Sequence, residues 1–175
     1  MSRRTVIKWL HWLSLGLLLY FFFVEPEESR TAPGQALSTH AGMGVLLALV
    51  AGIWLILYLR KGLAGRPGPK LPGWGKRFHP LGHKALQIGL VVVVASGAMA
   101  GLVAPFAIHA FGLMPINLGI GGKGLHDLAT EIHEIIFDGM ILLIVAHALF
   151  HIWRHVLLKD NALRIMVPKL LHKYL

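Results

Sequence analysis

Four long apolar runs divide the chain, and each is close to the length of a membrane-spanning helix. They cover residues 6–24, 37–59, 81–104 and 132–158. An α-helix needs about 20 apolar residues to cross the hydrocarbon core of a bilayer. The pattern therefore predicts an all-α fold, an integral membrane four-helix bundle that occupies residues 1–175 as a single transmembrane domain.

The segments between these runs are polar or rich in proline and glycine. Clustered charge at residues 25–28 ends the first run, and the loop of residues 60–79 contains three prolines. Such composition is typical of irregular, solvent-exposed backbone. We expect a short interfacial helix in the looser stretch of residues 105–130, and another in the basic tail after residue 158.

The first run has a second interpretation, because a basic start followed by apolar residues is also typical of a signal peptide. Against this, the run is long enough for a full span and contains Trp9, His11 and Trp12. No small-residue cleavage site follows Val24. We therefore expect a retained membrane helix.

The basic residues predict the orientation. Fifteen of the seventeen lysine and arginine residues flank the two chain ends and the middle loop, and only Arg30 and Lys123 lie in the other two loops. Short cytoplasmic loops carry the excess of positive charge in membrane proteins. Both termini and the middle loop should therefore face the cytoplasm. This placement also argues against nucleic-acid binding, despite a formal charge of +9.

Composition limits the redox chemistry. There are no cysteines, which excludes disulfides, thiolate iron–sulfur clusters and covalent c-type haem attachment. The chain instead has eleven histidines. Ionisable side chains inside membrane helices are costly and usually mark function. Four of those within the predicted spans fall at two depths: His11 and His147 towards the cytoplasm, and His40 and His133 towards the outer side.

The spacing on the last helix supports two haems. His133 and His147 are fourteen residues apart, about 40° short of four helical turns, so both project from one face. The rise between them is about 21 Å. A low-spin b-type haem takes one imidazole on each side of its iron. We therefore predict an inner haem iron held by His11 and His147, and an outer haem iron held by His40 and His133.

Geometry leaves one alternative open. His151 is eighteen residues from His133, a whole number of turns, so it lies on the same face. It is shallower than His147, as His11 also is, and depth slightly favours it as the partner of His11. Any single histidine at a helix end is more often an interfacial residue than a ligand. The matched depths of two pairs are harder to explain in that way.

With these residues in place, the chain resembles the bacterial cytochrome b561 family over nearly its whole length. The most specific matches are the fourteen-residue spacing and the segment from Lys159 to Arg164. The others are Leu10-His11-Trp12, Thr39-His40-Ala41-Gly42, Leu81-Gly82-His83-Lys84, Ile132-His133-Glu134 and His147-Ala148. One departure is Ser96, where such proteins often have proline.

The resemblance implies a small di-haem membrane cytochrome whose ligands fall on His11, His40, His133 and His147, and so selects His147 over His151. It also implies electron transfer with the quinone pool, with ubiquinone as acceptor. For some members it implies superoxide oxidation at the outer face. Related b-type subunits serve as quinone-linked anchors of larger oxidoreductases.

Our working hypothesis is an oxidoreductase that links a periplasmic donor to quinone. Lys123, His126 and His109 are candidates for attracting an anionic donor, although they are equally compatible with ordinary loop residues.

A homodimer is compatible with the sequence. Asp138 is expected to be a buried carboxylate with a structural polar contact. A histidine-lined carrier of zinc or copper is the rival from another class. Candidate quinone contacts near the inner haem are His151, His155, His83 and Trp12.

Overall fold

The computed structural model describes residues 2–24, 26, 34–63, 65, 67–167 and 172–173. Four long helices dominate it: α1 (Arg3–Phe23), α2 (Gln35–Lys61), α3 (Gly73–Leu102) and α4 (Lys123–Val156). Each contains a stretch long and apolar enough to cross a membrane. The predicted four-helix membrane fold is confirmed. The acidic residues Glu25, Glu27 and Glu28, and Arg30, lie outside the described residues.

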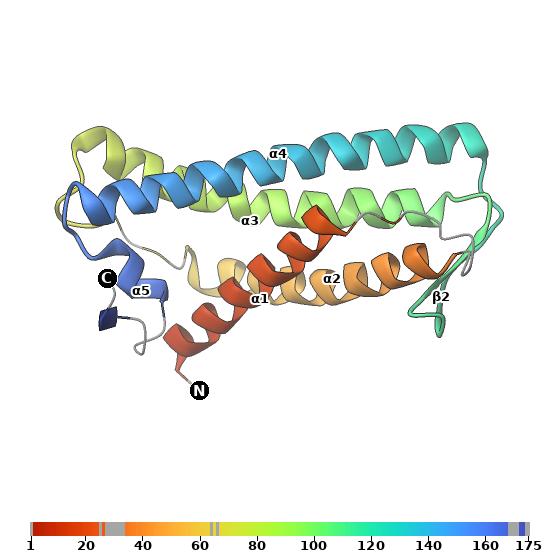
Figure 1. Ribbon diagram of the computed structural model, residues 1–175, viewed down its shortest axis with the longest axis horizontal. Helices are drawn as coiled ribbons and strands as arrows, with labels where there is room; N and C mark the ends of the chain where they lie inside the picture. Colours follow the sequence, from red (N-terminus) through yellow and green to blue (C-terminus); the bar gives the residue numbers. More distant parts are fainter. Residues whose placement is uncertain are drawn as a thin grey trace.

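The helices form two pairs. α3 and α4 lie side by side along their length, while α1 crosses α2 obliquely (Figure 1). α2 also packs on α3 and so joins the two pairs. The start of α1 and the C-terminal segment lie at one end of the bundle, and the α3–α4 connection lies at the other (Figure 1). We call these the inner end and the outer end.

The apolar core lies between the two ends. It joins side chains from all four helices, including Leu17 of α1, Leu47 of α2, Leu90 of α3 and Met140 of α4. Many large apolar side chains instead face outwards, as expected of a surface solvated by lipid; Leu142 is 70% exposed. Only a minority of the side chains in each membrane-spanning stretch are therefore buried inside the bundle.

The third helix begins eight residues earlier than predicted, at Gly73 and not at residue 81. Pro80 lies inside it and cannot donate the backbone hydrogen bond that the carbonyl of Lys76 would accept, a defect that normally bends or ends a helix. Packing compensates for this defect. Trp74 contacts Trp153 of α4, with ring centroids 5.2 Å apart. The proline- and glycine-rich composition of this segment had instead indicated an irregular loop.

A β-hairpin occupies the α3–α4 connection, where we predicted a short interfacial helix. Strands β1 (Ala107–Ala110) and β2 (Met114–Leu118) pair antiparallel through a turn in which Phe111 and Gly112 have positive φ. The hairpin docks on α2: the N–H of Phe111 donates to the carbonyl of Ser38 at 3.0 Å, and Ser38 Oγ donates to the carbonyl of His109 at 2.7 Å. That prediction was therefore wrong.

The fourth helix also begins early, at Lys123 and not at residue 132. Its first turns are polar, and Lys123 pairs with Asp127 one turn later at 2.7 Å. A 34-residue helix is about 51 Å long, which exceeds a hydrocarbon core of about 30 Å. The hydrophobic run therefore marks the part of α4 that fits the membrane core, and the helix itself extends beyond it.

The inner end is closed by a buried ion pair. After α4 the chain turns back through left-handed backbone at Lys159 and Asn161 into the short helix α5 (Ala162–Met166). Asp160 thereby meets Arg154 at 2.7 Å, with side chains only 1% and 2% exposed. Asp160 Oδ1 also accepts the N–H of Ala162 at 3.0 Å. The predicted tail helix is present, and the segment from Lys159 to Arg164 has a structural role.

Replacing Asp160 by alanine should destabilise the protein strongly, because it leaves the buried Arg154 guanidinium without its counter-ion. We expect the free energy of unfolding in detergent to fall by about 3–5 kcal/mol. Asp127→Ala is the matched control, because it removes an exposed ion pair whose loss should cost under about 0.5 kcal/mol. Equal effects of the two substitutions would contradict this role of Asp160.

Candidate functional site

The four predicted ligands lie at two levels of the bundle. His40 of α2 and His133 of α4 are close enough to interact electrostatically, and so are His11 of α1 and His147 of α4. Each pair therefore joins α4 to a helix of the other pair, α2 at the outer level and α1 at the inner level. All four side chains are half-buried.

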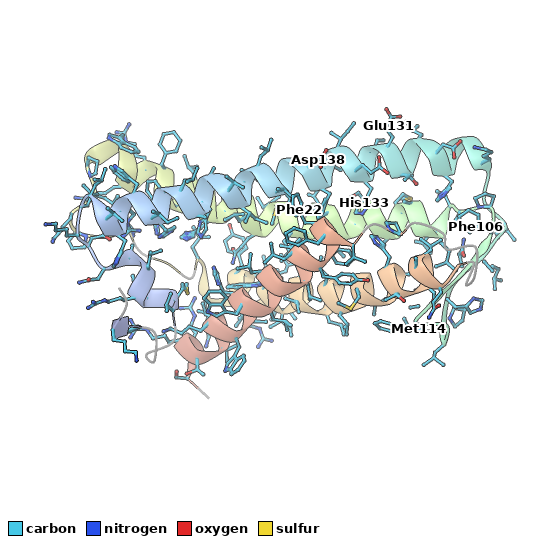
Figure 2. All side chains as sticks on the ribbon, in the orientation of Figure 1. Phe22, Phe106, Met114, Glu131, His133 and Asp138 are labelled. Carbon is cyan, nitrogen blue, oxygen red and sulfur yellow. The ribbon has the colours of Figure 1, made fainter. Side chains whose placement is uncertain are left out.

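At the outer level, His133 is held from one side. Its Nδ1 lies 2.9 Å from Ser96 Oγ, and that hydroxyl lies 3.0 Å from the carbonyl of Val93. Because the hydroxyl proton is directed to the Val93 carbonyl, Nδ1–H of His133 donates to Ser96, which leaves Nε2 as the acceptor nitrogen. A Cβ on Gly97 would lie 2.9 Å from Cε1 of His133, so glycine makes room for the ring. Figure 2 shows His133 directed from α4 towards α3.

The ring of His40 packs against α1. It contacts Phe21 edge to face, with centroids 4.9 Å apart, and its Nδ1 is buried without a hydrogen-bond partner. A side chain on Gly42 would collide with the ring of Phe111 at the hairpin turn. The glycine two residues after His40 therefore lets the hairpin close over the outer level.

The inner level contains more imidazoles than predicted. The ring of His147 lies 4.9 Å from that of His83 and 4.5 Å from that of His151. His79, which is 5% exposed, lies 4.3 Å from His83 and 5.7 Å from His151. These four residues come from two helices, α3 and α4. His11 approaches them from α1, and its Nδ1 is also buried and unpartnered.

The sequence did not reveal His79 as part of this group. It falls in the segment that we predicted to be an irregular loop, directly before Pro80. The available signal was its spacing from His83, because residues four apart on a helix share one face. That signal applies only if the helix starts before Pro80, as it does.

The remaining predicted site residues are placed as follows. Trp12 is 41% exposed, and its Nε1–H donates to the carbonyl of Met166 at 3.1 Å, so this tryptophan joins α1 to α5. His155 is half-buried, with Nδ1 unpartnered. At the outer end Lys123 is paired with Asp127, and His126 Nδ1 lies 3.0 Å from the carbonyl of Ala100. His109 is exposed on β1.

Asp138 departs from our expectation of a buried carboxylate. Its side chain is exposed, as are those of Glu131 and Glu134 on the same helix. In Figure 2, Glu131 and Asp138 lie on the side of α4 away from His133. The helix has one face towards the histidines, and Asp138 is on the other face. The prediction of a buried structural contact was wrong.

The comparison with family models settles the relationship. The model of prokaryotic cytochrome b561 matches residues 3–169, nearly the whole chain. The chain belongs to the prokaryotic cytochrome b561 family. The predicted resemblance is thus confirmed. A search of curated proteins found no match.

Membership of the cytochrome b561 family implies a multi-pass membrane protein that binds haem b and transfers electrons. The residues present fit that group. Imidazole is an axial ligand of b-type haem iron, and His11 and His40 each have a buried ring nitrogen that nothing in the described residues satisfies. His133 is held through Nδ1, which leaves the nitrogen that haem iron requires.

Proposed function

We propose that this cytochrome b561 holds two haems b and carries electrons between a donor at the outer face and the quinone pool, as a quinone-linked oxidoreductase. His40 and His133 would hold the outer haem, and His11 and His147 the inner one. Haem supplies reversible one-electron exchange at its iron. The observation that carries the proposal is the placement of the four histidines at two levels, each with α4 contributing one ring, together with the buried, unsatisfied Nδ1 atoms of His11 and His40.

The environment of His133 adds a specific role for Ser96. A hydrogen bond to Nδ1–H of a ligating imidazole fixes the ring orientation and makes the other nitrogen a stronger donor. Ser96 Oγ accepts this bond, and its own hydroxyl donates to the Val93 carbonyl. We infer that Ser96 positions His133 and stabilises the oxidised form of the outer haem.

Quinone chemistry is proposed at the inner end. Reduction of a quinone takes up protons together with electrons, and imidazoles are suitable proton donors at neutral pH. His83 lies beside His147 and has a buried, unpartnered Nδ1. We propose His83 as the group that holds the proton for a bound quinone, with His151 and His155 as further contacts.

The charge at the outer end bears on the donor. The ammonium group of Lys123 is compensated by Asp127, and Glu131 and Glu134 add exposed negative charge on α4. Such a surface provides little electrostatic attraction for an anion. Superoxide stays a candidate donor, but its reaction would not depend on attraction by Lys123.

The cellular placement follows from the basic residues. Fifteen of the seventeen lysine and arginine residues flank the inner end, which we therefore place at the cytoplasm. Quinone exchange at His83 would then occur on the cytoplasmic side of the bacterial inner membrane. The outer haem would face the periplasm.

The purified protein should show a reduced-minus-oxidised b-type spectrum with about two haems per chain, since two imidazole pairs are present. His147→Ala should lose the inner haem and keep the outer one, while His151→Ala should retain both. Haem content is measured as pyridine haemochrome. A colourless protein would instead support the metal-ion carrier, and haem loss only in His151→Ala would reassign the ligand. Haem without quinone-linked turnover, together with a co-purifying subunit, would favour the membrane-anchor alternative.

Ser96→Ala should raise the midpoint potential of the outer haem, because His133 becomes a weaker donor to the oxidised iron. Haem retention at the outer site should also weaken by about tenfold. Redox titration with optical detection separates the two haems. Ser14→Ala is the matched control, because that hydroxyl lies in α1 and contacts Trp54 rather than a histidine. An unchanged outer potential would rule out the positioning role.

His83→Ala should slow reoxidation of the reduced protein by a short-chain ubiquinone at least about tenfold, because the proton donor is lost. The measurement is stopped-flow absorbance after reduction, in a preparation whose haem content equals that of the wild type. His109→Ala, at the outer end, should leave the rate unchanged. If both variants react at the wild-type rate, quinone protonation does not use His83.

A further inference from the structure

A group of three histidines at the inner end is not accounted for by the haem ligands. His79 and His83 of α3 and His151 of α4 each offer one ring nitrogen, and these three nitrogens lie within 4.8 Å of one another. His79 Nδ1, His83 Nδ1 and His151 Nε2 are buried and have no hydrogen-bond partner among the described residues. An unsatisfied polar atom in an apolar interior costs about 1–3 kcal/mol.

We propose that these three histidines form a binding site for one divalent transition-metal ion of the zinc type. The site is distinct from the two imidazole pairs assigned to haem. It contains His79, which belongs to neither pair, and it does not require His147 or His11. The proposal therefore does not rest on the haem assignment. It shares His83 and His151 with the proposed quinone contacts, so an ion bound at a nitrogen of His83 would exclude a proton from that nitrogen.

The spacing of the ligands suits such an ion. His79 and His83 are four residues apart on one helix, the arrangement by which helical histidine pairs bind zinc. His151 completes the set from the neighbouring helix. In a tetrahedral site with Zn–N bonds of about 2.0–2.1 Å, ligand nitrogens are about 3.4 Å apart. The three nitrogens lie within 4.8 Å of one another, so binding would draw them together by at most about 1.4 Å.

The surroundings also suit a closed site with one open position. A Cβ at Gly65 would lie 3.2 Å from Cε1 of His79 and 3.5 Å from Cε1 of His83, so the inner loop covers the two rings closely. Three neutral imidazoles leave the fourth tetrahedral position for water. His147 is near His151, but haem iron would occupy its free nitrogen in the assembled protein.

Nearby positive charge is partly offset. Arg154 is within electrostatic reach of His79, His83 and His151. It forms the buried ion pair with Asp160, which also acts on His79. The metal would therefore bind near a cation that already has its counter-ion, and it would join α3 to α4 at the inner end.

The test is zinc binding by the haem-loaded protein in detergent, after chelator treatment and dialysis against zinc sulfate. We expect one zinc per chain by elemental analysis, in addition to haem iron. His79→Ala should bind zinc at least about tenfold more weakly, because a ligand is lost. His126→Ala, which removes a histidine from the opposite end, is the matched control and should bind like the wild type.

Two further measurements keep the result interpretable. An unchanged haem spectrum in His79→Ala shows that the variant is folded and that the haem sites are intact. Zinc should raise the thermal midpoint of the wild type and not of His79→Ala, since a ligand that binds only the folded state stabilises it. Absence of bound zinc, or equal binding by wild type and His79→Ala, would overturn the proposal. Neither result would affect the proposed haem ligands or electron transfer.

Discussion

The arrangement of this protein depends on a simple constraint: imidazole nitrogens inside an apolar bundle need partners. Backbone groups of membrane helices satisfy one another, but ring nitrogens cannot be satisfied in that way. Buried nitrogens of His11, His40, His79, His83 and His151 have no protein partner among the described residues. Such a set is costly for a protein that binds nothing, and it is reasonable for one whose interior is completed by haem iron, quinone or a metal ion.

Much of the fold follows from the sequence because lipid imposes a strict length on apolar segments. The four runs located four helices, and the first two have bounds within three residues of those predicted. The errors occur where packing, and not lipid, decides the structure. α3 starts before Pro80 because Trp74 and its neighbours pack on α4. The hairpin after α3 depends on hydrogen bonds to Ser38, which is 71 residues from His109 in the sequence.

In the candidate site, too, helix geometry was predictable from the sequence and side-chain packing was not. Helical geometry placed His133 and His147 on one face, and antiparallel helices brought His40 and His11 to matching levels. Those inferences need only the helix repeat and the direction of each span. The hydrogen bond from His133 to Ser96 could be identified only from side-chain positions. The presence of a serine in α3 does not by itself predict that contact. Asp138 was misplaced because depth in the membrane does not say which face of a helix a residue occupies.

The use of α4 at both levels has a consequence for the distance that electrons travel. If both pairs hold haem as proposed, one ligand of each haem would belong to the same continuous helix, and fourteen residues of hydrogen-bonded backbone would set the spacing of those two ligands. Movements of α1 or α2 would leave that spacing unchanged. The helix would then serve as a fixed spacer, and the rate of electron exchange between the haems would be insensitive to motions of the other helices.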